Sequence, residues 1–314
     1  MRTATFLFSS TVSLPSFRIP FPVQIATFCL LWASAFSVAK LSVTDCPPLL
    51  VLAARFALAG VIILGAAAVC GIPFKLSRRD TLIFALLGIA NQAAYLGLAY
   101  IGVRSISSGL SALIISANPV LTAVLGAMFL NERMTSRKAL GLLLGIGGVA
   151  FVVGSRFAGG ADHAVGIAFT IAALISLVCG TILFKRFAPK GSLWIGNGVQ
   201  SLSAAIAILP FAFTFESTAD VAPSWRLLAS LIYLAAFVSI FAYLLWFQLL
   251  HAFGATGASA YHFLMPPLGM LFGWLLLGEH VAATDLIGIL PVAAGIYLVT
   301  RQLEGAARRP KSEG

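Results

Sequence analysis

Residues 118–132 read NPVLTAVLGAMFLNE, and residues 265–279 read MPPLGMLFGWLLLGE. The two stretches begin 147 residues apart and share a proline, a glycine, a glutamate and two leucines in the same order. Beyond them, Gly141 and Gly148 match Gly288 and Gly295 at the same spacing. Leucine coincidences are common in apolar chains, but paired proline, glycine and glutamate are not, so the chain contains an internal repeat.

The repeat extends upstream with a slip of one residue, because Ala94-Tyr95-Leu96 matches Ala242-Tyr243-Leu244. Each copy contains five apolar stretches, and an odd number of membrane crossings inverts the second copy relative to the first. Inverted-topology repeats are typical of secondary transporters, in which two related halves open to either side of the membrane in turn. A duplicated scaffold without a transport role is the alternative interpretation.

The composition indicates a membrane protein. The chain has 314 residues, of which 60% are hydrophobic and only 10% are charged, and its mean hydropathy is +1.01. Soluble domains carry about 25% charged residues, so this composition excludes a soluble enzyme, a nucleic-acid binder and a disordered chain. The net charge of +10 comes from Lys and Arg residues that lie almost entirely between the apolar runs.

Ten stretches approach the roughly 20 apolar residues that a membrane-spanning helix needs. They predict an all-α polytopic membrane protein, formed by two inverted five-helix repeats. The expected spans are 21–40, 48–71, 81–102, 105–130, 137–154, 164–185, 193–214, 226–250, 255–277 and 285–300. The expected domains are a cytosolic tail (1–20), a first repeat (21–154), a second repeat (164–300) and a cytosolic tail (301–314).

The basic residues predict the orientation. With the N-terminus inside, 15 Lys and Arg residues fall on the inner side and four on the outer side, while Arg55 lies within the second span. This asymmetry follows the positive-inside rule and places both termini in the cytoplasm. Residues 1–20 are interpreted as a tail rather than a signal peptide. We expect an integral protein of a bacterial cytoplasmic membrane.

Short motifs in both halves carry a family resemblance. They are Leu30-Leu31-Trp32-Ala33-Ser34-Ala35-Phe36, Pro48, Ala54-Arg55-Phe56, Ser111-Ala112-Leu113, Asn118-Pro119, Leu130-Asn131-Glu132-Arg133, Ala242-Tyr243-Leu244-Leu245-Trp246-Phe247 and Leu277-Gly278-Glu279. These motifs resemble the EamA family of the drug/metabolite transporter superfamily over residues 21–302. The resemblance implies a ten-helix transporter with a central cavity lined mainly by spans 1, 3, 4, 6, 8 and 9. It does not specify a substrate, because family members export amino acids, metabolites or drugs.

Charged groups within the spans are few. All ten acids lie in connectors, tails or span ends, so the mid-span carboxylate common in proton-coupled antiporters is absent from the sequence. The resemblance implies an Arg at the position of Arg55 in members with different substrates, so Arg55 is interpreted as a structural intramembrane charge. A counter-charge for an anionic or zwitterionic substrate is the alternative. His262 is either a proton-responsive group or a helix–helix hydrogen bonder.

Uncharged polar and aromatic side chains within the spans are the candidates for substrate contact. In hydrocarbon, polar groups need partners, so they face another helix or a wet cavity. Interhelical hydrogen bonding explains each of the amides about as well as substrate contact does. The predicted cavity residues are Trp32, Asn91, Tyr95, Asn118, Tyr243, Trp246, Gln248 and His262.

Two prolines and two glutamates occupy matching positions in the repeats. Pro119 and Pro266 each remove a helical hydrogen bond and bend their span, and paired breaks in corresponding helices point to a transport path. Glu132 and Glu279 follow the same two spans. We expect each glutamate to hold a helix terminus or an ion pair at a gate.

These observations predict an alternating-access secondary transporter that exports small metabolites, such as amino acids or related amphipathic compounds. The expected partners are a small-molecule substrate and the lipid bilayer, with no nucleic acid, no cofactor, no metal and no enzymatic activity, in a monomer or homodimer. A membrane-embedded protein that handles lipids or isoprenoids, as a flippase or an enzyme, is the alternative. An enzyme would need clustered acids or histidines, and a channel would need a repeated pore filter. Energy coupling stays open.

Overall fold

Apolar helices make up nearly all of the computed structural model, which describes residues 20–130, 134–158, 163–187, 189–281 and 283–307, and no strand occurs among these residues. Seven stretches are long and apolar enough to cross a membrane: Phe21–Ser42, Pro48–Val69, Arg78–Val103, Ser108–Phe129, Ala164–Phe187, Leu193–Phe215 and Trp225–Leu277. The predicted all-helical membrane protein is therefore confirmed at this level.

Thirteen α-helices run through the described residues. In the first half they are α1 (Phe21–Ser42), α2 (Pro48–Val69), α3 (Arg78–Leu87), α4 (Tyr95–Val103), α5 (Ser108–Ile115), α6 (Asn118–Phe129) and α7 (Ser136–Ala158). In the second half they are α8 (Ala164–Phe187), α9 (Leu193–Phe215), α10 (Trp225–Ile232), α11 (Tyr243–Ser259), α12 (Met265–Leu277) and α13 (Ala283–Ala307). Serine side chains cap the first turns of α3, α5, α9 and α10 and satisfy backbone N–H groups there.

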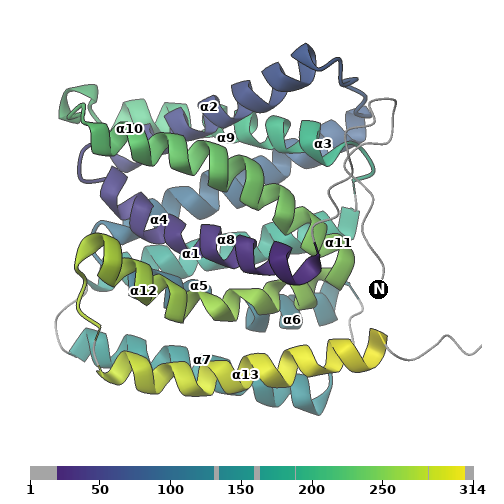
Figure 1. Ribbon diagram of the computed structural model, residues 1–314, viewed down its shortest axis with the longest axis vertical. Helices are drawn as coiled ribbons and strands as arrows, with labels where there is room; N and C mark the ends of the chain where they lie inside the picture. The colour runs from purple at the N-terminus through teal and green to yellow at the C-terminus, as the bar shows by residue number, and fades with distance from the viewer. Residues whose placement is uncertain (1–19, 131–133, 159–162, 188, 282, 308–314) are drawn as a thin grey trace, which may run out of the picture.

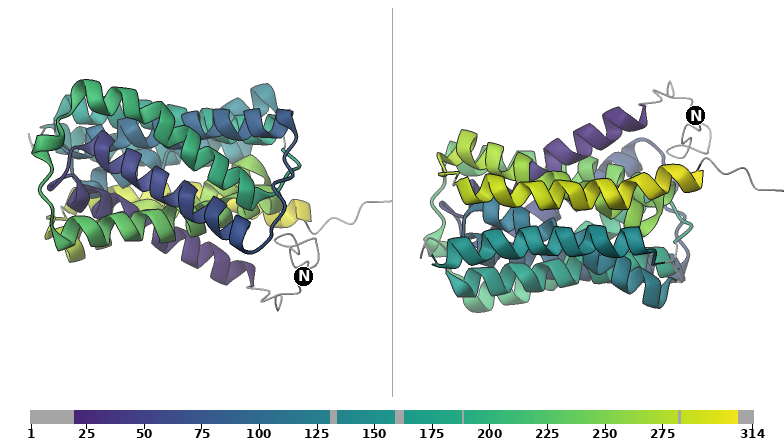
Figure 2. Two further views of the ribbon diagram at one scale, coloured as in Figure 1. Left: turned by 90° about the horizontal axis from the view of Figure 1, so that it is seen from above. Right: turned by 90° about the horizontal axis from the view of Figure 1, so that it is seen from below.

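The helices form a bundle in which segments of the two halves alternate (Figure 1). Helix α2 packs along α9, α4 packs along α8, and α1 packs against α12 and α5. Helices α7 and α13 pack against each other as a separate outer layer, at the bottom of Figure 1 and in front in the right view of Figure 2. The first and second halves therefore share one core.

Glycines allow α7 and α13 to approach closely. A methyl group on Gly148 would lie 2.7 Å from the carbonyl oxygen of Gly288, and one on Gly295 would lie 2.5 Å from that of Gly141. Both distances are too short for any side chain, so the backbones meet directly. The sequence repeat matches Gly141 with Gly288 and Gly148 with Gly295. Exchanging the two repeats therefore turns one of these contacts into the other.

Two π-helical segments interrupt the spans that contain the matched Ala-Tyr-Leu motifs. Residues Gly88–Ala94 (η1) precede α4, and residues Tyr233–Ala242 (η3) precede α11. A 147-residue shift also relates the starts of α6 at Asn118 and α12 at Met265. A 3₁₀ segment, Ala260–Leu264 (η4), precedes α12. Irregular helix therefore recurs at corresponding positions, and π-bulges are frequent at functional sites.

The 53-residue apolar stretch Trp225–Leu277 turns back on itself at Gly254. Gly254 has φ 75° and ψ 179°, a conformation that residues with a Cβ rarely adopt. In Figure 1 the chain runs from α10 at the left to α11 at the right, and α12 returns to the left. Gly254 thus separates two antiparallel segments.

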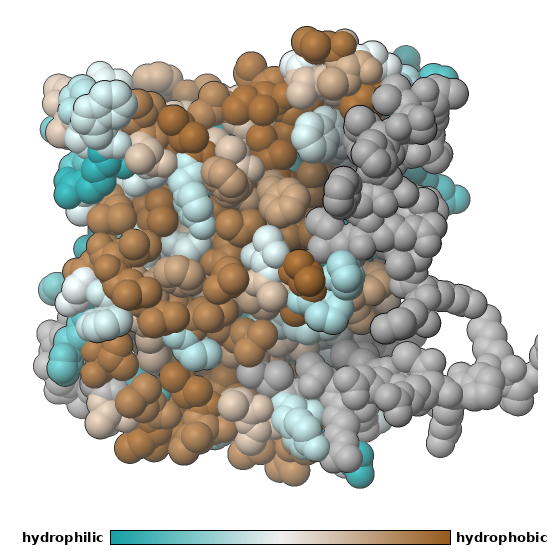
Figure 3. Space-filling view, viewed as in Figure 1, coloured by the Kyte–Doolittle hydropathy of each residue, from teal (hydrophilic) through white to brown (hydrophobic). Residues whose placement is uncertain are grey.

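The surface of the bundle is apolar around its middle. Figure 3 shows a broad hydrophobic face, with hydrophilic residues concentrated toward the left and right edges. Val61, Leu143, Ile206, Phe213 and Leu290 are each more than 50% exposed. Lipid tails cover such side chains in an integral membrane protein, and the polar edges lie where its helices end.

Candidate functional site

A small cavity lies inside the bundle, between α1, α2, α4, α5 and the junction of η3 with α11. Its volume is about 30 Å³, which is room for one or two water molecules. The lining residues are Trp32, Ala35, Phe36, Ala39, Arg55, Tyr95, Leu96, Ala99, Tyr100, Val103, Ser111, Val238 and Tyr243. This volume is smaller than an amino acid.

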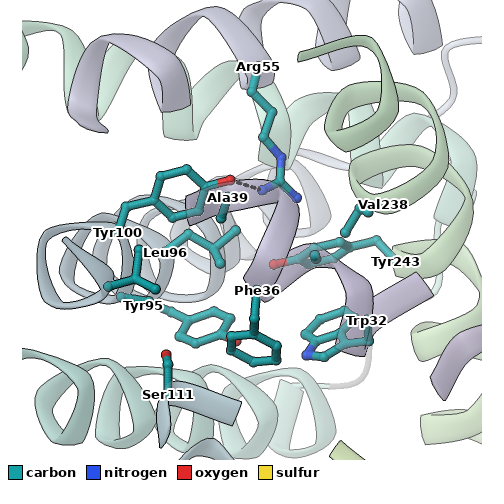
Figure 4. A pocket seen from close by; sticks show the side chains of 13 residues that line it. Trp32, Phe36, Ala39, Arg55, Tyr95, Leu96, Tyr100, Ser111, Val238 and Tyr243 are labelled. Carbon is teal, nitrogen blue, oxygen red and sulfur yellow. Dashed lines mark hydrogen bonds between the residues drawn. The ribbon is translucent and has the colours of Figure 1, made fainter. Parts of the chain in front are cut away.

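Arg55 is the one formally charged residue of this lining. Its side chain is 1% exposed and reaches from α2 into the cavity, between Tyr100 and Tyr243 (Figure 4). Its Nε donates to the Ser239 hydroxyl at 2.8 Å, and its Nη1 donates to the Tyr100 hydroxyl at 2.9 Å. Its guanidinium also lies 5.3 Å from the ring centre of Phe56. All of these contacts are with neutral groups.

Three buried tyrosines line the cavity together with Arg55. Tyr95 and Tyr100 come from α4, and Tyr243 comes from the start of α11. The Tyr243 hydroxyl donates to the carbonyl oxygen of Asn91 in η1 at 2.9 Å. The cavity wall therefore joins both halves of the chain and both π-helical segments.

An aromatic cluster continues from the cavity toward η4. The Trp32 ring lies 5.2 Å from Tyr243 and 5.6 Å from His262, and the Trp246 ring lies 5.0 Å from His262. Phe28 stacks on Trp246 at 5.6 Å. The predicted residues Trp32, Tyr243, Trp246 and His262 thus meet in one cluster, although only Trp32 and Tyr243 line the cavity.

His262 is fully buried in this cluster. Neither ring nitrogen has a hydrogen bond of normal geometry, and the nearby polar group is the backbone of Ser259, one turn earlier. Rings of Phe28, Trp32 and Trp246 face it edge to face. The surroundings of the imidazole are therefore mainly aromatic, and no side chain of another helix bonds to it among the described residues.

The predicted amides lie outside the cavity lining. Asn91 supports Tyr243 through its backbone carbonyl, and its side chain packs against Gly180. Asn118 accepts a hydrogen bond from Thr122 at 2.7 Å, one turn along α6. Gln248 is half-buried on α11. These three amides belong to helix packing in this state.

Side chains of other helices satisfy the carbonyl groups of the π-helical segments. Asn197 of α9 donates to the Ser239 carbonyl at 2.9 Å, and Ser176 of α8 donates to the Ala90 carbonyl at 2.9 Å. Sequence reasoning predicted neither π-helical segment. Sequence reasoning also missed Tyr100 and Ser239 as partners of Arg55. The only signal for them in the sequence was a tyrosine and a serine within apolar stretches.

Pro119 and Pro266 each stand in the first turn of a new helix. The chain breaks at residues 116–117 before α6, and η4 breaks it before α12. A proline in the first turn removes no intrahelical hydrogen bond. Each proline therefore lies at a break in its span, and neither removes the helical hydrogen bond that we expected it to remove.

Acid networks join helix ends at one end of the bundle. We name it the Lys40 end: α1, α4 and α12 end there, and α2 and α5 begin there, at the left of Figure 1. The Glu279 carboxylate lies 2.9 Å from the Lys40 Nζ and accepts hydrogen bonds from the backbone N–H and hydroxyl of Ser108. This carboxylate joins α12 to α1 and to the start of α5, where a negative charge is favoured. Its predicted counterpart, Glu132, lies outside the described residues.

A second network at the Lys40 end joins the α1–α2 loop to α10. Asp45 forms an ion pair with Arg226 and accepts a hydrogen bond from the Ser224 hydroxyl at 2.5 Å. These hydrogen bonds lower the pKa of the Asp45 carboxyl to about 2. Although burial raises the pKa of Glu279, hydrogen bonds from Ser108 and Lys40 hold it below its ordinary value. Both acids are therefore ionised at neutral pH.

A bundle of apolar helices around a small, mostly apolar cavity with one buried cation defines an integral membrane protein with an internal site. The chain matches the model of the EamA-like transporter family over residues 23–154 and 164–301, and it belongs to that family. It is a membrane transporter, as the resemblance in its motifs implied.

Relatives of known name are transporters. An uncharacterised transporter of Archaeoglobus fulgidus is 27% identical over 89% of this chain and 98% of that protein. A probable amino-acid metabolite efflux pump of Escherichia coli is 25% identical over 86% of this chain and 91% of its own length. An S-adenosylmethionine/S-adenosylhomocysteine transporter of Chlamydia muridarum is 28% identical over 86% and 88%. One crystal structure shares the fold, with a TM-score of 0.66 at 18% identity over 91% of this chain and 98% of that one.

Proposed function

We propose that this protein is an alternating-access secondary exporter of small metabolites, such as amino acids or related amphipathic compounds. The observation that carries the proposal is the buried Arg55 guanidinium, held by neutral groups at the wall of a cavity between the two halves. A buried ion in that position is costly in free energy unless a ligand compensates its charge or water hydrates it. The efflux pump of Escherichia coli, similar over 86% of this chain, supports export of amino-acid-like compounds.

The architecture proposed for this activity is ten spans in two inverted repeats, over residues 21–154 and 164–300, between the tails 1–20 and 301–314. Three observations support it: the recurring π-helical segments, the reciprocal glycine contacts of α7 with α13, and a family match in two segments. The excess of basic residues in alternate connectors supports cytoplasmic termini in a bacterial inner membrane.

The site residues divide into five proposed roles. Trp32, Tyr95 and Tyr243 form the cavity wall, and Arg55 is the counter-charge, which favours the alternative to a purely structural charge. Trp246 and His262 back the wall through ring contacts. Asn91, Asn118 and Gln248 enter the cavity surface only if the helices move. The joints of that movement are Pro119 and Pro266. The glutamates that close the ends are Glu132 and Glu279.

Counterflow in proteoliposomes tests the function. The purified protein is reconstituted, loaded with an unlabelled amphipathic amino acid or carboxylate, and given the same labelled compound outside. A carrier accumulates label transiently, because its binding site exchanges sides fastest when loaded. A channel gives no such overshoot, and recovery of a chemically altered compound would identify an enzyme instead.

Reporter fusions test the topology independently. Fusions after residues 77 and 136 are expected to report the cytoplasm, and fusions after residues 104 and 158 are expected to report the outer side. Reversal at one of these four sites would contradict the inverted repeat.

A further inference from the structure

The charge balance of the cavity is the starting observation. Arg55 contributes one positive charge, and none of the other lining residues is acidic. The guanidinium has five N–H donors, of which the structure gives partners to Nε and Nη1. Both partners are hydroxyl groups, so the cavity carries a net positive charge before any ligand enters.

Acids of the described residues that lie nearest in the fold have other partners. Glu279 pairs with Lys40, and Asp45 pairs with Arg226. The two carboxylate oxygens of Glu216 accept the backbone N–H groups of Leu49 and Leu50 at the start of α2. None of these carboxylates lines the cavity, so an ammonium group that entered would find no anionic partner there.

Most of the cavity lining suits contact with an apolar ring. Trp32, Phe36, Leu96 and Val238 line the cavity beside the tyrosines (Figure 4). Aromatic walls of this kind hold flat apolar groups by offset or edge-to-face contacts. The planar guanidinium fits a carboxylate through two parallel hydrogen bonds. The lining therefore combines one cationic group with apolar and aromatic side chains, and the helices must separate to admit a ligand larger than water between them.

We propose that the cavity selects aromatic monocarboxylates that lack an ammonium group over the corresponding amino acids. A monoanion neutralises Arg55 and leaves the loaded site without net charge. A zwitterion also neutralises Arg55, but it buries an ammonium group without a carboxylate, and an unpaired buried ion is strongly disfavoured. The proposal rests on the transport function above and narrows its substrate class.

Four compounds with one ring and different charged groups test the proposal. They are 3-phenylpropionate, L-phenylalanine, 2-phenylethylamine and neutral 3-phenylpropionamide, used as competitors of labelled 3-phenylpropionate on the purified full-length protein. We expect 3-phenylpropionate to compete at a concentration at least tenfold lower than L-phenylalanine, and the amine and amide to compete weakly. Equal or better competition by L-phenylalanine would overturn the proposal, and so would failure of 3-phenylpropionate to bind.

Variants connect the preference to charge. Arg55→Gln is expected to lose at least tenfold in affinity for 3-phenylpropionate, while Arg55→Lys keeps the order of the four compounds at lower affinity. The exposed Arg104, at the same end of the bundle, provides the matched control: Arg104→Gln removes an equal charge outside the cavity and leaves the order unchanged. An equal loss in Arg104→Gln would assign the effect to the overall field and contradict the proposal.

Ser111→Asp gives a test that does not depend on the folding of Arg55→Gln. Ser111 lines the cavity, is 1% exposed, and its hydroxyl has no hydrogen-bond partner. A carboxylate there would receive the ammonium group, so the preference should shift toward L-phenylalanine. An unchanged preference would overturn the proposal. If 3-phenylpropionate binds but shows no counterflow, the anion site stands and the transport function is rejected. If L-phenylalanine shows counterflow and no preference for the anion is found, the transport function stands and the anion preference is rejected.

Discussion

Single buried side chains of this protein act through packing as much as through polarity. His262 has three aromatic neighbours with ring centres 5.0–5.8 Å away, and no normal hydrogen bond reaches its ring nitrogens. Arg55 presents the opposite case, because its charge is held by the hydroxyls of Tyr100 and Ser239. The core therefore contains one histidine whose contacts are mainly aromatic and one arginine whose partners are hydroxyl groups.

The first prediction separates shape from polarity at His262. His262→Phe keeps the ring contacts and is expected to change the free energy of unfolding by less than about 1.5 kcal/mol, as volume-conserving core changes do. His262→Ala leaves a cavity among three rings and should cost about 2–4 kcal/mol. Thermal unfolding of the two variants in detergent measures the difference. A large loss in His262→Phe would mean that the nitrogens are hydrogen-bonded in the folded protein.

At the scale of helices, the apolar runs predicted an all-helical membrane protein correctly, because length and hydropathy decide which segments can cross a bilayer. The ten spans in two inverted repeats stay a prediction. The π-helical segments were not predicted, since their register depends on Asn197 and Ser176 from other helices. Of the residues that line the cavity, Trp32, Tyr95 and Tyr243 were among the predicted ones, from their residue type and from the spans that the resemblance assigns to a cavity. Tyr100 and Ser239 were missed because they contact Arg55 across 45 and 184 residues of chain.

The second prediction concerns the packing of η1 on α9. A methyl group on Gly88 would meet the backbone carbonyl of Gln200, which cannot move as a side chain would. Gly88→Ala is therefore expected to cost about 1–3 kcal/mol of unfolding free energy. Gly65→Ala is the control, since nothing lies within 4 Å of its added methyl, and it should be neutral or stabilising by up to about 1 kcal/mol. Equal melting temperatures for both variants would contradict the close approach.

The third prediction concerns the proline joints. Pro119→Ala and Pro266→Ala each restore a backbone N–H in the first turn, which lets the broken span become one continuous helix. We expect both variants to reach normal expression and stability but to show several-fold slower counterflow, because a straight span cannot swing at the joint. Near-wild-type rates in both variants would mean that the breaks serve only to accommodate neighbouring side chains.

In the proposed transport cycle, the ion pairs at one end of the molecule and the small cavity correspond to a state that is closed at the Lys40 end. The Lys40 end is held by Glu279 with Lys40 and by Asp45 with Arg226, and each pair joins elements far apart in the chain. At the opposite end the described contacts include Arg79 donating to the Phe187 carbonyl and Lys185 donating to the Leu250 carbonyl. Carboxylates thus strengthen the closure of the Lys40 end in this state.

The pKa values of these acids set the pH range of the closure. Because the folded state lowers the pKa of Glu279 and of Asp45, their contribution is fully present above the ordinary carboxyl pKa. It is lost only as the pH falls through the lowered values, which for Asp45 means about pH 2. We therefore expect accessibility at the Lys40 end to stay constant between pH 8 and pH 6, measured by the labelling described next.

The last prediction tests the closure itself. A cysteine replaces Ala39, which lines the cavity beside Lys40, in a protein whose four native cysteines have been substituted. Glu279→Gln keeps the side-chain shape but removes the charge that attracts Lys40 and the N-terminus of α5. Labelling of this cysteine by an impermeant thiol reagent should therefore become several-fold faster than in the parent.

The variant matched to Glu279→Gln is Arg79→Gln, which weakens a contact at the end of the bundle opposite the Lys40 end. If the two ends open in alternation, this change shifts the population toward the state that is closed at the Lys40 end, and labelling slows. A carrier with independent ends would instead show no effect of Arg79→Gln on residue 39. Unchanged labelling in Glu279→Gln would mean that packing of α12 against α1, rather than its acid network, keeps this end closed.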